Sequence, residues 1–90
     1  MFWDICGIMF WMDLILDVRN LNEWNSGHGA HSILIPLPEL ENRISELESY
    51  KNKNVVVVCR SGNMAGQAVN ILERYGFVNL QNGGSWENFK

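Results

Sequence analysis

One short segment of this chain has residue types suited to nucleophilic chemistry: Cys59-Arg60-Ser61-Gly62-Asn63-Met64-Ala65. It follows the β-branched run 55–58, which predicts a buried strand, and apolar residues at helical spacing predict a helix over 63–75. A cysteine between a strand and a helix faces unpaired backbone N–H groups and the positive end of the helix dipole, and both favour the thiolate. Arg60 adds a positive charge beside it. We therefore predict that Cys59 is a nucleophile in an anion-binding loop.

The alternative interpretation of Cys59 is structural, because a cysteine at the end of a buried strand is usually a small hydrophobic residue. The four residues after it favour chemistry, since a purely structural turn does not need an arginine beside the thiol. Ser61 and Gly62 are small and let a ligand approach the backbone. The second cysteine, Cys6, lies in an apolar stretch with no cation near it in sequence, which predicts an inert thiol.

The elements that must position Cys59 alternate along the chain. We predict strands at 14–18, 33–35, 55–58 and 77–80. We predict helices at 20–25 and 63–75, and a short helix that Ser85 caps and that ends at residue 89. A further helix begins at Pro38, with Leu40, Ile44 and Leu47 on its inward side. Gly76 fits the end of the third helix, and 83–84 reads as a turn. This alternation indicates a parallel sheet, in which Asp17, the turn at 35–36 and Cys59 share the carboxyl edge where ligands bind.

The loop after the third predicted strand resembles the active-site loop of rhodanese-type sulfurtransferases. Other segments are similar to that family in order and spacing: Leu16-Asp17-Val18-Arg19, Glu23-Trp24, Gly27-His28, Ile35-Pro36-Leu37, Tyr75-Gly76-Phe77, Gly83-Gly84 and Trp86. The resemblance covers about 14–89. It implies an α/β fold, a small three-layer rhodanese-like domain with a mostly parallel sheet and helices on both faces. The chain would be one such domain over 1–90, with an atypical, short segment at 1–13.

The resemblance implies an activity as well. A sulfane sulfur would move from a donor such as thiosulfate to cyanide or a thiol through a persulfide on Cys59, with no cofactor. A protein could also be the acceptor. The substrate-binding residues would be Arg60, Ser61, Gly62, Asn63, Met64 and Ala65, and structural support would come from Asp17, Arg19, Glu23 and His28. Charges at a buried strand end are normally paired, and Glu23 is the expected partner of Arg19.

The sequence departs from the family pattern at two places besides the short segment 1–13, where the family normally has an additional strand and helix before its Asp-x-Arg strand. Gly29-Ala30-His31-Ser32 stands where the family usually has an apolar residue, Pro, Gly and Ala, and Met64 and Ala65 stand where it often has Arg or Ser. Two alternatives stay open. A cysteine phosphatase or arsenate reductase also uses a thiolate in an anion cradle, but its loop ends in an arginine that clamps the oxyanion. A non-enzymatic rhodanese-like interaction module commonly lacks the cysteine, which this chain keeps, and a related possibility is a sulfur relay that accepts a persulfide from a protein partner.

Composition limits the remaining possibilities. The net charge of −3 gives no electrostatic case for binding nucleic acid or acidic membranes, and a free thiol nucleophile favours the cytoplasm. His28 and His31 lack further ligands nearby, so we expect no metal site and an exposed His31. The apolar segment 1–12 is too short to span a membrane. We expect it to pack on the sheet, with weak self-association as the alternative, and we expect the 4 tryptophans mostly in the core.

Overall fold

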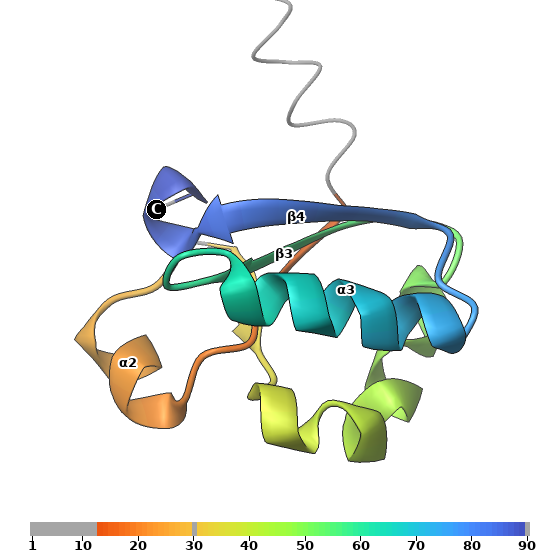
Figure 1. Cartoon of the computed structure of the whole chain (residues 1–90), viewed down its shortest axis with the longest axis horizontal. Helices are drawn as coiled ribbons and strands as arrows, with labels where there is room; N and C mark the ends of the chain where they lie inside the picture. Colours follow the sequence, from red (N-terminus) through yellow and green to blue (C-terminus); the bar gives the residue numbers. More distant parts are fainter. Residues whose placement is uncertain (1–12, 30, 90) are drawn as a thin grey trace, which may run out of the picture.

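The computed structural model describes residues 13–29 and 31–89 (Figure 1). These residues form a sheet of four parallel strands in the order β2-β1-β3-β4. The strands are β1 (Leu14–Asp17), β2 (Ser32–Leu34), β3 (Asn54–Cys59) and β4 (Asn79–Ser85). The parallel sheet predicted from the sequence is therefore confirmed. The expected packing or self-association of the segment 1–12, and the environment of Cys6, lie outside the described residues.

Strand β3 is the centre of the fold. It pairs with β1 on one side and β4 on the other, and the four valines and Cys59 within it are all at most 1% exposed. β-branched side chains suit this position because they pack well on a pleated surface covered on both faces. The strand therefore holds Cys59 at its carboxyl end with little freedom to move.

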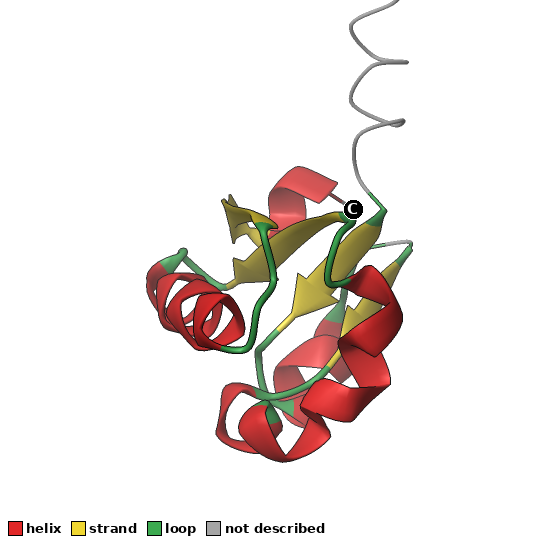
Figure 2. Cartoon of the chain, turned by 90° about the vertical axis from the view of Figure 1, so that its right-hand side faces the viewer, coloured by secondary structure: helices red, strands yellow, loops and turns green. Residues whose placement is uncertain are grey.

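Helical segments cover both faces of the sheet (Figures 1 and 2). One face packs against α3 (Asn63–Arg74) and against the 3₁₀ segments η1 (Leu37–Glu39) and η2 (Glu41–Tyr50). Ala65 and Ala68 on α3 are fully buried, so α3 lies close to β3 and β4. The other face is covered by η3 (Trp86–Phe89). The side chains of Phe89 and Val56 both lie within 3.1 Å of the position that a Cβ on Gly83 would occupy. This is the three-layer arrangement expected from the sequence.

The segment after Pro36 corrects one prediction. Leu40, Ile44 and Leu47 are buried as expected, but η1 and η2 are 3₁₀ rather than α-helical, with non-helical backbone at Arg43. The inward side chains explain this: Leu37 and Leu40 are three apart, as are Ile44, Leu47 and Tyr50. A spacing of three matches the 3₁₀ repeat. The non-helical backbone at Arg43 accommodates the one spacing of four residues, between Leu40 and Ile44.

Strand β4 corrects a second prediction. Gly83 and Gly84, expected in a turn, lie inside the strand, and Phe77 lies before it. The register with β3 shifts by one residue, so that Val57 pairs with Asn82 and Val58 with Gly84. Gly83 is thus the extra residue of a β-bulge. A Cβ there would lie 2.6 Å from Val56 Cγ1 and 2.9 Å from Phe89 Cε1, so the packing of these two side chains requires glycine.

Glycines lie on both sides of the helix that follows β3, and Gly76 was predicted at its end. Gly62 caps α3 with φ 103°, and Gly76 has φ 94° just after the helix. At that end, Phe77 N donates to Leu72 O over 3.1 Å, the long bond of a Schellman motif. Both glycines supply left-handed backbone that other residues adopt only with strain. Gly62 matters most here, because it bends the chain directly over the end of β3.

Candidate active site

The predicted nucleophile lies at the carboxyl edge of the sheet. Cys59 ends β3 beside Asp17, which ends the neighbouring strand β1, and Ile35 N donates to Asp17 O over 3.0 Å. The three segments that the sequence placed at this edge are therefore together. Cys59 is 1% exposed, so its side chain has almost no contact with solvent in this conformation.

Backbone N–H groups surround the sulfur of Cys59 in a cradle formed by residues 59–65. Gly62 N donates to Sγ over 2.9 Å, and Ala65 N donates to it over 3.4 Å. Ala65 is in the first turn of α3, so its N–H has no partner within the helix. Donors fixed in this way are placed to bond an anion at this position, because bonds to an ionised acceptor are stronger.

The other predicted loop residues have different surroundings. Arg60, Ser61 and Asn63 are exposed, and Met64 is half-buried against the core. Within the described part of the chain, the N–H bonds to Sγ come only from Gly62 and Ala65. The loop therefore divides into two backbone positions that contact the sulfur and side chains that point elsewhere.

Asn82 on β4 holds the cradle in place. Its Nδ2 donates to Gly62 O over 2.9 Å, and its Oδ1 accepts from Gly84 N over the same distance. The Gly62 carbonyl also accepts from Gly66 N at 2.9 Å. These bonds fix the carbonyl of Gly62, the residue whose own N–H reaches Sγ. The sequence reasoning missed Asn82 because 79–85 was expected to hold a strand end and a turn, and nothing local in the sequence places an asparagine at a bulge.

A buried ion pair supports the loops on the other side of Cys59. The guanidinium of Arg19 contacts the carboxylate of Asp17 with Nε and Nη2 at 2.8–3.0 Å, and both side chains are at most 4% exposed. Asp17 Oδ1 also accepts from Arg19 N, and Arg19 Nη2 donates to Gly27 O at 2.7 Å. Arg19 further lies 4.5 Å from the ring centre of Trp86. One arginine thus joins β1, the segment after α2 (Leu21–Ser26), and η3.

The expected pairing of Glu23 with Arg19 is wrong. Glu23 instead forms a capping box at the start of α2: Asn20 Oδ1 accepts from Glu23 N at 2.8 Å, and Glu23 Oε1 accepts from Asn20 N at 3.4 Å. Asp17 is closer in sequence and already buried, so it takes the arginine. His28 is exposed, stacks on Trp24 with ring centres 3.7 Å apart, and bonds Trp24 O through Nδ1, which fits its expected role in the turn. His31 is exposed, as expected.

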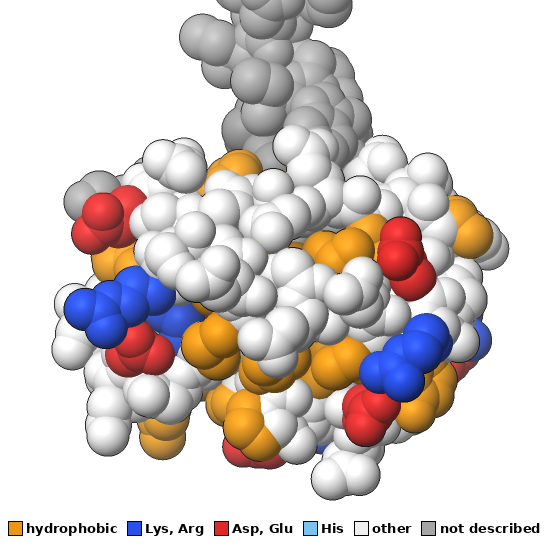
Figure 3. Space-filling model, viewed as in Figure 1, with side chains coloured by type: hydrophobic (Ala, Val, Ile, Leu, Met, Phe, Trp, Pro, Cys, Tyr) orange, Lys and Arg blue, Asp and Glu red, His pale blue; other side chains and the backbone are white. Residues whose placement is uncertain are grey.

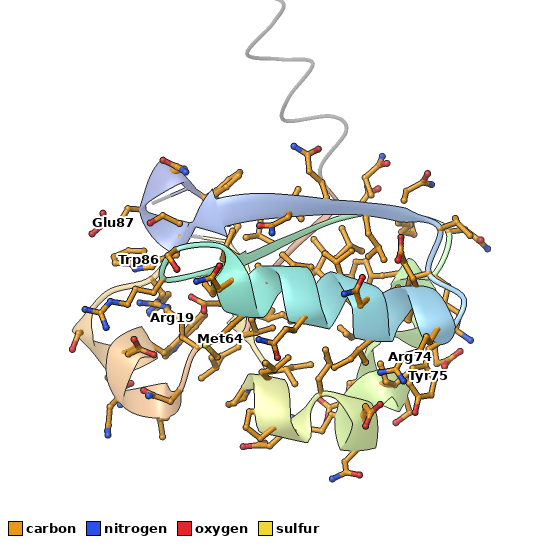
Figure 4. All side chains as sticks on the ribbon, viewed as in Figure 1. Arg19, Met64, Arg74, Tyr75, Trp86 and Glu87 are labelled. Carbon is orange, nitrogen blue, oxygen red and sulfur yellow. The ribbon has the colours of Figure 1, made fainter. Side chains whose placement is uncertain are left out.

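A pocket of about 400 Å³ opens beside the cradle, lined by Arg19, Glu23, Ser26, Arg60, Ser85, Trp86 and Glu87. Arg19, Trp86 and Glu87 lie together at this end of the molecule (Figure 4). Ser85 pairs with Cys59 across the strands and caps η3 by accepting from Glu87 N at 3.2 Å. Neither described tryptophan, Trp24 nor Trp86, is buried, which corrects the expectation of core tryptophans. Nothing in the sequence marked Ser85 or Glu87 as lining residues.

Two further observations concern the described residues alone. No group of three His, Cys, Asp or Glu side chains among them is arranged to hold a metal ion. No helix in that part of the chain has both the length and the apolar character to cross a membrane.

The comparisons with known proteins agree with this geometry. The sequence model of the Rhodanese-like domain family matches residues 8–90. The chain belongs to this family. The structure titled "rhodanese with anions from E. coli" superposes with a TM-score of 0.76 at 33% identity, covering 83% of this chain and 88% of that one. The rhodanese resemblance read from the sequence is therefore confirmed.

Two curated relatives of this rhodanese-like domain have informative names. It is 36% identical over 69 residues to thiosulfate sulfurtransferase PspE of Escherichia coli (strain K12), covering 77% of this chain and 66% of PspE. It is 34% identical over 68 residues to the putative sulfur carrier protein YrkF of Bacillus subtilis (strain 168), covering 76% of this chain and 36% of YrkF. The chain thus spans about two thirds or less of the length of these relatives.

Proposed function

We propose that this rhodanese-like domain is a sulfurtransferase that carries a sulfane sulfur as a persulfide on Cys59. The observation that carries the proposal is the pair of N–H groups directed at Sγ from Gly62 and Ala65. A thiolate and a persulfide are both anions, so the same donors stabilise the free enzyme and the intermediate. The names of the relatives PspE and YrkF support sulfur transfer as the chemistry.

The reaction would proceed in two displacements. The Cys59 thiolate attacks the outer sulfur of thiosulfate, a new S–S bond forms, and the bond inside thiosulfate breaks as sulfite leaves with its electron pair. The enzyme then holds a Cys59–S–S⁻ persulfide. A second nucleophile, cyanide or a thiolate, attacks the outer sulfur, and the electron pair returns to Sγ. Charge and atoms balance in each step without a redox cofactor.

The geometry favours sulfur transfer over phosphoryl transfer. A phosphate carries charge on three oxygens and is best held by a guanidinium that clamps it bidentately. The positions five and six residues after Cys59 are Met64 and Ala65, and Arg60 lines the neighbouring pocket. A cradle with two N–H donors around the sulfur of Cys59, a residue that is 1% exposed, suits one added sulfur atom better than a tetrahedral oxyanion.

Intact-mass measurement tests this proposal directly. After incubation with thiosulfate, the protein should gain the mass of one sulfur atom, and cyanide should remove it. Cys59→Ser should abolish both the mass gain and thiosulfate:cyanide turnover while keeping the fold, measured by circular dichroism. Cys6→Ser is the matched control and should keep both. Turnover in folded Cys59→Ser, or hydrolysis of p-nitrophenyl phosphate faster than thiosulfate consumption, would overturn the assignment.

A further inference from the structure

The pocket beside the cradle contains charges of both signs. Its lining includes Arg19 and Arg60 together with Glu23 and Glu87. At the end of the molecule that holds α2 and η3, acidic side chains lie on either side of a basic one (Figure 3). A site for a simple dianion would be expected to carry positive charge alone. The two carboxylates therefore need a separate explanation.

The charges available to a ligand sum to a negative value. Arg19 is neutralised by Asp17, with which it forms a buried ion pair at 2.8 Å. This leaves one positive charge on Arg60 and two negative charges, on Glu23 and Glu87. Among the described residues, neither Arg60 nor Glu87 takes part in an ion pair. Both exposed groups are therefore free to meet a ligand.

We propose that this pocket binds the sulfur acceptor, and that the acceptor is a small aminothiol whose ammonium group is held by Glu87 and Glu23. The proposal rests on the proposed function, because it names the substrate of the second displacement. Where the acceptor also bears a carboxylate, Arg60 is the group that meets it. A volume of about 400 Å³ accommodates a molecule of this size, larger than cyanide.

The position of the pocket fits delivery of a thiol to the persulfide. Ser85 and Arg60 both line the pocket. Ser85 pairs with Cys59 in the register of β3 and β4, and Arg60 directly follows Cys59 in the chain. An aminothiol held here lies next to the strand end that carries the persulfide. Its thiolate attacks the outer sulfur, the Cys59 S–S bond breaks, and the electron pair returns to Sγ. The acceptor leaves as a persulfide, so no further reactant is needed.

Discharge of the loaded protein by thiols of different charge tests the proposal. The protein is loaded with thiosulfate, desalted, and mixed with cysteamine (cationic), 2-mercaptoethanol (neutral) or mercaptoacetate (anionic), and loss of the added sulfur is followed by intact mass. Glu87→Gln is compared with the unchanged protein for each thiol, which cancels the thiols' intrinsic reactivities. Glu73→Gln is the matched control, since Glu73 is an exposed carboxylate on α3 outside the pocket.

We expect Glu87→Gln to slow discharge by cysteamine about threefold to fivefold, as for one partly screened charge contact. Discharge by 2-mercaptoethanol should not change, and discharge by mercaptoacetate should become faster. Glu73→Gln should change none of them. An equal effect of Glu87→Gln on all three thiols, or no effect, overturns the aminothiol proposal while sulfur loading still supports the proposed function. Failure of the unchanged protein to take up sulfur overturns both.

Discussion

The cradle and the pocket lie side by side but present different chemical groups. The cradle contacts Cys59 Sγ through backbone N–H groups of Gly62 and Ala65, whereas the pocket is formed by charged and aromatic side chains such as Arg19 and Trp86. Side-chain substitution can therefore change what the pocket binds without removing the donors that stabilise the sulfur. The cradle is sensitive instead to backbone conformation, which is set by Gly62 and by Asn82.

The largest expected effect comes from breaking the ion pair behind the pocket. Asp17→Asn keeps the shape of the side chain but leaves the Arg19 charge buried without its carboxylate, at 3% exposure. Removing one partner of a buried pair typically costs about 3 kcal/mol or more. We expect a loss of about this size in the free energy of unfolding, measured by urea denaturation, with the cradle retained in the fraction that stays folded.

An exposed pair on η2 provides the control for Asp17→Asn. Hydrogen bonding from Arg43 lowers the pKa of Glu46 below its ordinary value. The pair therefore stabilises the folded protein fully at pH values above the ordinary pKa of a glutamate. This stabilisation is lost as the pH falls through the lowered pKa of Glu46. Both groups face solvent, so Glu46→Gln should change stability little at neutral pH. Equal losses for the two substitutions would show that burial of the Asp17 pair contributes nothing.

The cradle is tested by adding one methyl group to its backbone. Gly62→Ala places a Cβ on a residue with φ 103°, which costs about 1–2 kcal/mol, and the Cβ lies 3.4 Å from Gly84 Cα. Relief of this strain moves the Gly62 N–H away from Sγ. We expect sulfur loading from thiosulfate to slow about tenfold, measured by time-resolved intact mass.

Gly66→Ala is the matched control for Gly62→Ala. It lies inside α3, where alanine favours the helix by about 0.5–1 kcal/mol, and its Cβ meets only Asn82 Nδ2 at 3.5 Å. This variant should gain stability and keep its loading rate. If Gly62→Ala also loads at the unchanged rate, the left-handed conformation of Gly62 is not what orients the donor.

The sequence was sufficient for those features that depend on local pattern. The valine run, the glycines around α3 and the loop after Cys59 follow from residue type and spacing, and they predict the parallel sheet and the position of the thiol. The bulge at Gly83 did not follow, because glycine marks turns and bulges alike. Arg19 was expected to pair with Glu23 and pairs with Asp17 instead, and Asn82 was not expected to contact the loop around Cys59. These contacts depend on which strand ends meet in space, which a single sequence does not encode locally.

The smallest expected effect concerns Arg60, which belongs to both the cradle and the pocket. Its substitution shows whether its side chain acts on the substrate in the pocket or on the shape of the cradle. Its backbone belongs to the loop around Sγ, while its exposed side chain lines the pocket and does not bond Sγ. An exposed charge contact is worth about 1 kcal/mol, so Arg60→Ala should lower kcat/KM for thiosulfate about fivefold and leave a neutral donor such as an organic trisulfide unaffected. Arg60→Lys should keep most of the thiosulfate rate, and added salt should reduce the difference, because screening weakens exposed charges. An equal loss with both donors would mean that Arg60 acts through the shape of the loop and belongs with the cradle.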